Sequence, residues 1–143
     1  MKRHTRTFIQ LLTLSGLAAA GGALAADENA MARKFAEDRL AYFAKGDTDA
    51  LMNQYAPDAT VITPMGVLHG RGQIRPMIDG IIAEFAQPGV NFNLISQTAD
   101  GPIVAFTWSA ETGRNIYDLG AETYVLENGG AKYQTFAEKT APR

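Results

Sequence analysis

One stretch, residues 46–85, constrains what this chain can fold into more than any other. Asp47 is a good N-cap, because its carboxylate can accept free N–H groups in the first turn of a short helix. Pro57 ends that helix, since proline cannot continue a helical hydrogen-bond ladder and restricts the residue before it. The helical spacing predicts that one face holds Leu51, Met52 and Tyr55.

Two strands and an amphipathic helix follow in the same stretch. Residues 60–63 are β-branched, which suits a pleated, half-buried strand, and residues 67–69 form a brief second strand after a turn. A continuous apolar stripe over residues 74–85, spaced by three and four positions, predicts the helix. Because Pro76 is tolerated only near a first turn, we expect regular helix to begin near Arg75 or to bend there.

The first 25 residues have the pattern of a signal peptide. Basic residues at positions 2, 3 and 6 precede an apolar run, residues 8–20, that is too short to span a bilayer. Residues 23–25 form an Ala-x-Ala site, so we predict cleavage after Ala25; an uncleaved anchor is the alternative. The remaining domain, residues 26–143, is then periplasmic or secreted, with no membrane contact after cleavage.

Charge and cysteine content narrow the function of that domain. The predicted signal peptide holds three of the 13 Lys and Arg and none of the 15 Asp and Glu. The net charge of residues 26–143 is therefore 10 − 15 = −5. This balance argues against a nucleic-acid-binding surface or a polybasic membrane patch. The chain has no cysteine, which excludes disulfides, thiol catalysis and thiolate metal ligands.

A long helix is predicted over residues 30–45, and one charged residue lies on its apolar face. Arg39 falls inside the apolar stripe, between Phe35 and Phe43. An isolated buried charge is too costly, so Arg39 must be paired or open to a cavity. The alternative is that its side chain extends along the stripe to reach water.

From residue 90 the apolar pattern switches to alternation, which predicts four strands. Strand 103–111 places Val104, Phe106 and Trp108 on one face, and the last two strands form a hairpin around an Asn-Gly-Gly turn. Trp108 could stack on a ligand, lie in the core or lie in an interface. If this face points outward it is too apolar to leave in water, and we then expect a homodimer through the sheet.

The segments GDTDALMNQYAPDATVITP and LHGRGQI resemble the nuclear transport factor 2-like superfamily, which includes SnoaL-like polyketide cyclases and ketosteroid isomerase. The resemblance covers residues 30–139, makes residues 26–143 one SnoaL-like domain, and adds family habit to the dimer prediction. It implies an α+β, cone-shaped fold of order ααββαββββ. Three helices pack on a curved, mostly antiparallel sheet, with a pocket between them.

The resemblance also assigns positions in that pocket. The isomerase's general base, an aspartate at the end of the first strand, corresponds to Thr63, which cannot accept a proton as a carboxylate can. The isomerase's two oxyanion donors correspond to Arg39 and Glu122. Tyr55 matches a tyrosine that lines the isomerase pocket. Steroid isomerisation is therefore not expected.

Alternation places Glu122 on the same strand face as Tyr124 and Leu126, so Glu122 should point at the core. Together with Arg39 on the apolar helix face, this predicts an ion pair between Arg39 and Glu122 at the closed end of the pocket. The predicted pocket residues are Arg39, Tyr55, Thr63, Trp108, Glu122 and Tyr124.

His69, the one histidine of the mature chain, could be a general base or metal ligand, or simply a residue at the end of a strand. A single histidine without nearby partners makes a poor metal site, so we predict neither metal nor cofactor. The residues leave open whether the chain is an enzyme and do not assign catalytic residues.

Three functions follow from these observations. The first is an exported domain that binds a small hydrophobic molecule without the isomerase's catalytic base. The second is an isomerase, cyclase or dehydratase that acts on a small hydrophobic substrate through Glu122, Tyr55, His69 or Arg39. The third is a structural or assembly module that dimerises through its sheet.

Overall fold

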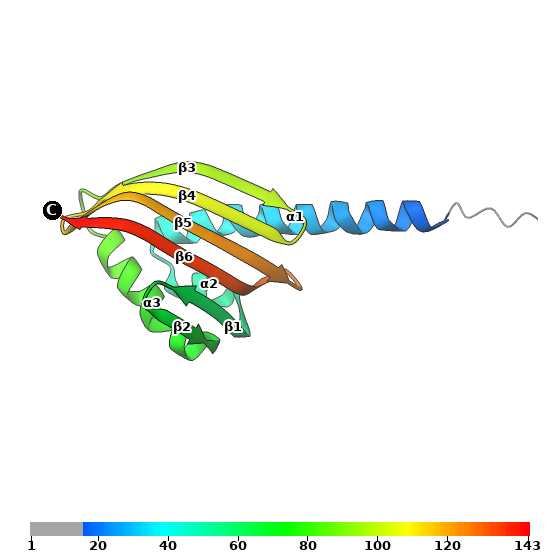
Figure 1. The fold of residues 1–143 in the computed structure, drawn as a ribbon, viewed down its shortest axis with the longest axis horizontal. Coiled ribbons are helices and arrows are strands. Elements are labelled where there is room, and N and C mark those ends of the chain that lie inside the picture. Colours follow the sequence, from blue (N-terminus) through cyan, green and yellow to red (C-terminus); the bar gives the residue numbers. More distant parts are fainter. Residues whose placement is uncertain (1–15) are drawn as a thin grey trace, which may run out of the picture.

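The computed structural model describes residues 16–143 (Figure 1). Its helices are α1 (Gly16–Lys45), α2 (Thr48–Asn53) and α3 (Gly70–Phe85). Its strands are β1 (Tyr55–Thr63), β2 (Gly66–His69), β3 (Asn91–Asp100), β4 (Ile103–Glu111), β5 (Asn115–Glu127) and β6 (Gly130–Pro142). This order confirms the predicted α+β fold, ααββαββββ.

The six strands form one sheet in the order β2-β1-β6-β5-β4-β3. Neighbouring strands are antiparallel except for β1 and β6, which run parallel. Figure 1 shows strands β3–β6 arched over α1, with α2 and α3 on the same side. The predicted hairpin between β5 and β6 turns at Asn128 and Gly129, both with positive φ, as a two-residue hairpin turn requires.

The core lies between the inner face of the sheet and the helices. Alternate residues of β4, Val104, Phe106 and Trp108, are 0%, 4% and 5% exposed. They pack inward with Phe35 of α1 in one apolar cluster. This strand face therefore points inward, so the condition on which it would support a dimer is not met. The homodimer stays a prediction, without support from this face.

Two local predictions are wrong. The short helix α2 ends at Asn53, so Tyr55 lies on β1 and not on the helix; Asp47 does cap α2, accepting from the backbone N of Ala50 at 3.0 Å. Helix α3 begins at Gly70 and contains Pro76, so the predicted late start near Arg75 is wrong, while the alternative of a bend there stays a prediction. The buried side chains of Ile74 and Ile78 hold this helix against the core on both sides of the proline, so packing outweighs the missing backbone donor.

Helix α1 extends the predicted helix toward the N-terminus. The predicted leader lies outside the described residues up to position 15, and residues 16–25 form the first turns of α1. Figure 1 shows this part of α1 projecting beyond the sheet. Asn29 links α1 to the turn between β3 and β4, because its Oδ1 accepts from the backbone N of Gly101 at 2.9 Å. No helix within residues 16–143 is both long and apolar enough to cross a membrane.

Candidate ligand-binding site

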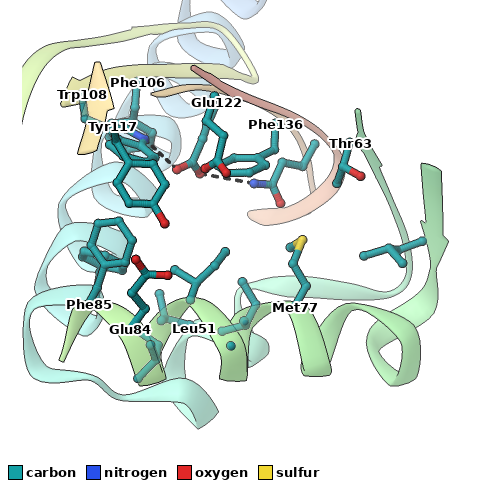
Figure 2. A pocket seen from close by; sticks show the side chains of 18 of the residues that line it. Leu51, Thr63, Met77, Glu84, Phe85, Phe106, Trp108, Tyr117, Glu122 and Phe136 are labelled. Atoms are coloured by element: carbon teal, nitrogen blue, oxygen red, sulfur yellow. Dashed lines mark hydrogen bonds between the residues drawn. The ribbon is translucent and has the colours of Figure 1, made fainter. Parts of the chain in front are cut away.

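A cavity of about 880 Å³ lies between the inner face of the sheet and the helices (Figure 2). Helices α1, α2 and α3, the β1–β2 turn and strands from β3 to β6 all contribute to its wall. Most lining side chains are apolar, and a few polar groups lie among them. Its volume falls within the range of roughly 300–1,000 Å³ that is usual for small-molecule sites.

Arg39 occupies the deep end of the cavity. Its side chain comes from the apolar face of α1 and is only 8% exposed, so it does not extend to water. Its Nε donates to the hydroxyl of Tyr124 at 2.8 Å, and its Nη2 donates to the hydroxyl of Tyr55 at 2.9 Å. The guanidinium also lies 4.8 Å and 5.0 Å from the ring centres of these tyrosines, within cation–π range.

These contacts keep the guanidinium charged. Burial alone would lower the pKa of Arg39, but the phenolic oxygens of Tyr124 and Tyr55 and the carboxylate of Glu122 raise it. Burial raises the pKa of both tyrosines, so their hydroxyls stay protonated and can donate. The hydroxyl of Tyr55 donates to Oε1 of Gln134 at 2.5 Å.

Glu122 receives three donors from different strands. Trp108 Nε1 donates to Oε1 at 3.0 Å, Gln134 Nε2 donates to Oε2 at 3.2 Å, and the Tyr124 hydroxyl donates to the same Oε2. Figure 2 shows Trp108 beside this carboxylate, with the hydrogen bond between them at the cavity wall. These three donors come from three neighbouring strands and fix the orientation of the carboxylate at the cavity wall.

The predicted ion pair between Arg39 and Glu122 is wrong. Among the described residues, Glu122 is absent from the ion pairs within 4.0 Å, and Tyr124 stands between the two charged groups. A phenol can accept from one neighbour and donate to the other, so it links a cation to an anion that do not touch.

The six predicted pocket residues do not all reach the cavity surface. Arg39, Thr63, Trp108 and Glu122 line it. Tyr55 and Tyr124 are 1% and 0% exposed and lie behind the wall, where they hold Arg39. The Thr63 hydroxyl is engaged locally, donating to the carbonyl of Gly66 at 3.1 Å and accepting from the backbone N of Met65 at 3.2 Å.

Trp108 forms the centre of an aromatic wall. Its ring lies 5.6–5.8 Å from the ring centres of Phe85, Phe92 and Tyr117. On the sheet side it covers Gly120, its partner across β4 and β5. A Cβ added to Gly120 would lie 2.2 Å from Cε2 of Trp108, so only glycine fits beneath this ring.

A second polar group also lines the cavity and was not predicted from sequence. Glu84 of α3 lines the cavity, and its Oε1 accepts from the Thr112 hydroxyl at 2.6 Å and from Asn115 Nδ2 at 2.9 Å. Burial opposes ionisation of Glu84, but these hydrogen bonds outweigh it and lower its pKa. Burial, followed by the nearby Glu84, raises the pKa of Tyr117 to about 12.

A comparison with models of protein families shows which family this chain belongs to. The model described as the SnoaL-like domain matches residues 32–134, most of the chain. The chain belongs to the SnoaL-like domain family. Among curated proteins, none matches it.

Solved structures similar to this SnoaL-like chain share its fold at low sequence identity. A SnoaL-like protein of unknown function from Burkholderia thailandensis E264 is 20% identical, with a TM-score of 0.61 over 77% of this chain and 95% of that one. An NTF2-like protein of unknown function from Mesorhizobium loti is 16% identical, with a TM-score of 0.65 over 78% and 93%. A candidate ketosteroid isomerase from Kribbella flavida DSM 17836 is 16% identical, with a TM-score of 0.65 over 80% and 82%.

Two polar residues of this SnoaL-like domain could have been found from its sequence pattern. Gln134 is 3% exposed and lies two residues before Phe136, on the inward face of β6. Glu84 lies three residues after Ile81 and seven after Met77, on the side of α3 that faces the cavity. Thr112 lies in a loop, where neither period applies.

His69 is not part of the cavity wall. It is exposed at the N-terminus of α3, and its ring Nδ1 lies 3.4 Å from the Thr60 hydroxyl. Within residues 16–143, no three His, Cys, Asp or Glu side chains are grouped to hold a metal ion. This position fits the interpretation of His69 as a strand-end residue.

Proposed function

We propose that this SnoaL-like chain is an exported domain that binds a small, mostly apolar molecule in the cavity between its sheet and helices. The observation that carries the proposal is the cavity itself, about 880 Å³ with a mostly apolar wall. Burying apolar ligand surface contributes about 25 cal/mol per Å², so such a wall favours a hydrophobic ligand. The leader pattern in residues 1–25 supports export to the periplasm or beyond.

The polar groups of the cavity suit binding of a ligand better than proton transfer of the isomerase type. Thr63 stands at the position of the isomerase base, and its hydroxyl is engaged in the β1–β2 turn. Glu122 is held in place by three hydrogen-bond donors. A general base must come within hydrogen-bond reach of the proton it removes, and the bonds that already engage both side chains compete with such a contact.

A second candidate is an isomerase, cyclase or dehydratase that uses Glu122. The observation that favours it is the position of this carboxylate at the cavity wall, at the end of a hydrogen-bond chain that runs from Arg39 through Tyr124. Such a chain could stabilise charge that develops on a substrate near Glu122. The two candidates differ in what leaves the cavity: an unchanged ligand or a product.

Native mass spectrometry of the protein purified from its own host tests the binding proposal. We expect a bound small molecule that is released unchanged on denaturation. A molecule that is converted when added back to the pure protein would favour the enzyme instead. Finding no bound molecule, and no binding of added hydrophobic compounds, would refute both.

A variant that fills the cavity gives a second test of the binding proposal. Gly80 of α3 lines the cavity and has open space where a Cβ would lie, so Gly80→Phe should place a ring in the cavity and improve helix propensity. Gly72 of the same helix also has open space but does not line this cavity, so Gly72→Phe is the control. We expect Gly80→Phe alone to lose the ligand while both variants stay folded.

A further inference from the structure

The charges around the cavity do not balance. Its charged lining residues are one cation, Arg39, and three carboxylates, Glu84, Glu122 and Glu138, which sum to −2 when all are ionised. The guanidinium of Arg39 is already engaged by two tyrosine hydroxyls. Among residues 16–143, the ion pairs within 4.0 Å involve other acids. The cavity therefore presents an excess of negative charge to whatever enters it.

The three carboxylates face the same space although they come from α3, β5 and β6. Figure 2 shows Glu84 and Glu122 on opposite sides of the cavity. The bonds from Thr112 and Asn115 both use Oε1 of Glu84, and the Tyr117 hydroxyl contacts the same carboxylate at the cavity wall. Partial burial, and then the charges of Glu84 and Glu122, raise the pKa of Glu138, as expected for acids that share one space.

The same cavity is rich in aromatic rings. Its lining includes Phe43, Phe85, Phe92, Phe106, Trp108, Tyr117 and Phe136. An aromatic face attracts a cation through its quadrupole, more strongly when water is excluded. A neutral hydrophobic ligand would use the rings but would remove water from the carboxylates without replacing its hydrogen bonds, which is costly. A ligand with a positive charge would satisfy both the rings and the carboxylates.

We propose that the ligand of this cavity is an organic cation, an apolar body that carries an ammonium group, with its charge held among Glu84, Glu122 and Glu138. This inference rests on the proposed function, because it names the chemical class of the molecule bound there. The apolar body lies against Met77, Ile78 and Ile81 of α3, the helix whose last turn also carries Glu84.

The chain carries its own reporter for a binding test. Trp108 is the one tryptophan in the sequence and lines the cavity, so its fluorescence reports occupancy. Three probes share a ten-carbon chain and differ in charge: decyltrimethylammonium, 1-decanol and decanoate, each kept below its micelle concentration at pH 7. We expect decyltrimethylammonium to bind about tenfold more tightly than 1-decanol, a difference of about 1.4 kcal/mol, and decanoate to bind least.

Substitutions test which carboxylates cause the preference for the cationic probe. Glu84→Gln combined with Glu138→Gln should reduce affinity for decyltrimethylammonium to near that of 1-decanol, and it should not weaken 1-decanol binding, because a neutral ligand then dries fewer charges. Glu127→Gln, which removes an exposed carboxylate at the end of β5 outside the cavity lining, is the control. It should keep the full preference for the cation.

The outcomes separate the two proposals. Equal affinity for all three probes, or a cation preference that the double variant keeps, would overturn the inference about charge and leave hydrophobic binding standing. If none of the probes changes Trp108 fluorescence and calorimetry detects no heat of binding, both the proposed function and this inference fail.

Discussion

Tyr124 donates its phenolic hydrogen to Glu122, two residues earlier on the same face of β5. The same oxygen accepts from Nε of Arg39 at 2.8 Å and from Nε2 of Gln134 at 2.9 Å. One phenol thus joins α1, β5 and β6 at the deep end of the cavity. A longer path through Tyr55 and Gln134 also links Arg39 to Glu122, but Tyr124 is the side chain that bonds directly to both.

Removing this hydroxyl should destabilise the fold. Tyr124→Phe keeps the ring but leaves Nε of Arg39 buried without its acceptor, at a cost of about 1–3 kcal/mol. Tyr133→Phe, at a tyrosine that is 52% exposed, is the control and should change stability by less than about 0.5 kcal/mol. Urea denaturation measures both; equal losses would contradict the role assigned to Tyr124.

Lysine should not replace Arg39. The guanidinium reaches the hydroxyls of Tyr55 and Tyr124 with two different nitrogens, a fork that a single ammonium cannot reproduce. We expect Arg39→Lys to lose about 1–3 kcal/mol of stability. Arg33→Lys, on the exposed side of the same helix, should have no measurable effect. A similar melting temperature for both variants would count against the fork.

Adding one methyl group beneath Trp108 should disturb the cavity wall. A Cβ at Gly120 would meet Cε2 of Trp108 at 2.2 Å, so Gly120→Ala must displace the ring and strain the core, at about 1–3 kcal/mol. The displaced ring also loses its hydrogen bond to Glu122. We expect red-shifted tryptophan fluorescence. Gly113→Ala, where a Cβ has open space, is the control, and an unchanged spectrum in Gly120→Ala would contradict the packing.

Two glutamates of the cavity should affect stability in opposite directions with pH. The folded pKa of Glu84 lies below its ordinary value of 4.5, so its carboxylate stabilises the fold above pH 4.5 and loses this effect as pH falls through the folded pKa. The pKa of Glu138 is raised above 4.5, so its ionisation opposes folding at pH 7 and this penalty disappears below pH 4.5.

At pH 7, Glu84→Gln should therefore be less stable than the wild type and Glu138→Gln more stable. Both differences should shrink toward zero as the pH is lowered below 4.5. Urea denaturation from pH 3.5 to pH 7 gives the two curves, and each variant is the control for the other. If both variants differ from the wild type in the same direction at pH 7, the opposite effects assigned to Glu84 and Glu138 are contradicted.

The exported form is predicted to begin at Ala26. Cleavage there keeps Asn29, whose side chain accepts from the backbone N of Gly101. A chain of residues 26–143 should therefore melt at the same temperature as the full chain, whereas one of residues 31–143 should melt lower. The intact mass of the protein from a periplasmic fraction tests the cleavage, and a mass that retains residues 1–25 would refute it.

Periodicity in the sequence predicted much of the deep end of the cavity. The 3.6-residue period of the first helix placed Arg39 on its apolar face, and alternation placed Glu122 and Tyr124 on one face of their strand. Periodicity gives direction but not distance. It could not predict that Tyr124 would separate Arg39 from Glu122, because that depends on how α1 lies across the sheet.

The predictions that failed concern places where packing overrides local preference. Proline at position 57 suggested a helix end near it, but strand pairing begins earlier, at Tyr55. Pro76 suggested a late helix start, but Ile74 and Ile78 are buried on either side of it. The contact between Glu84 and Thr112 joins a helix to a loop 28 residues away, and no short-range pattern carries it.

The parallel pairing of β1 with β6 has a consequence for how the chain folds. Tyr55 pairs with Ala131, so β1 cannot pair with β6 until the chain has been synthesised 76 residues further. Strand β6 is also the link in the sheet between the pair β2-β1 and the trio β5-β4-β3. Closing so long a loop is slow, and the sheet stays in two pieces until the C-terminal strand is available. If the chain is exported as we predict, this pairing can form only after β6 has crossed the membrane, so the fold is completed on the far side.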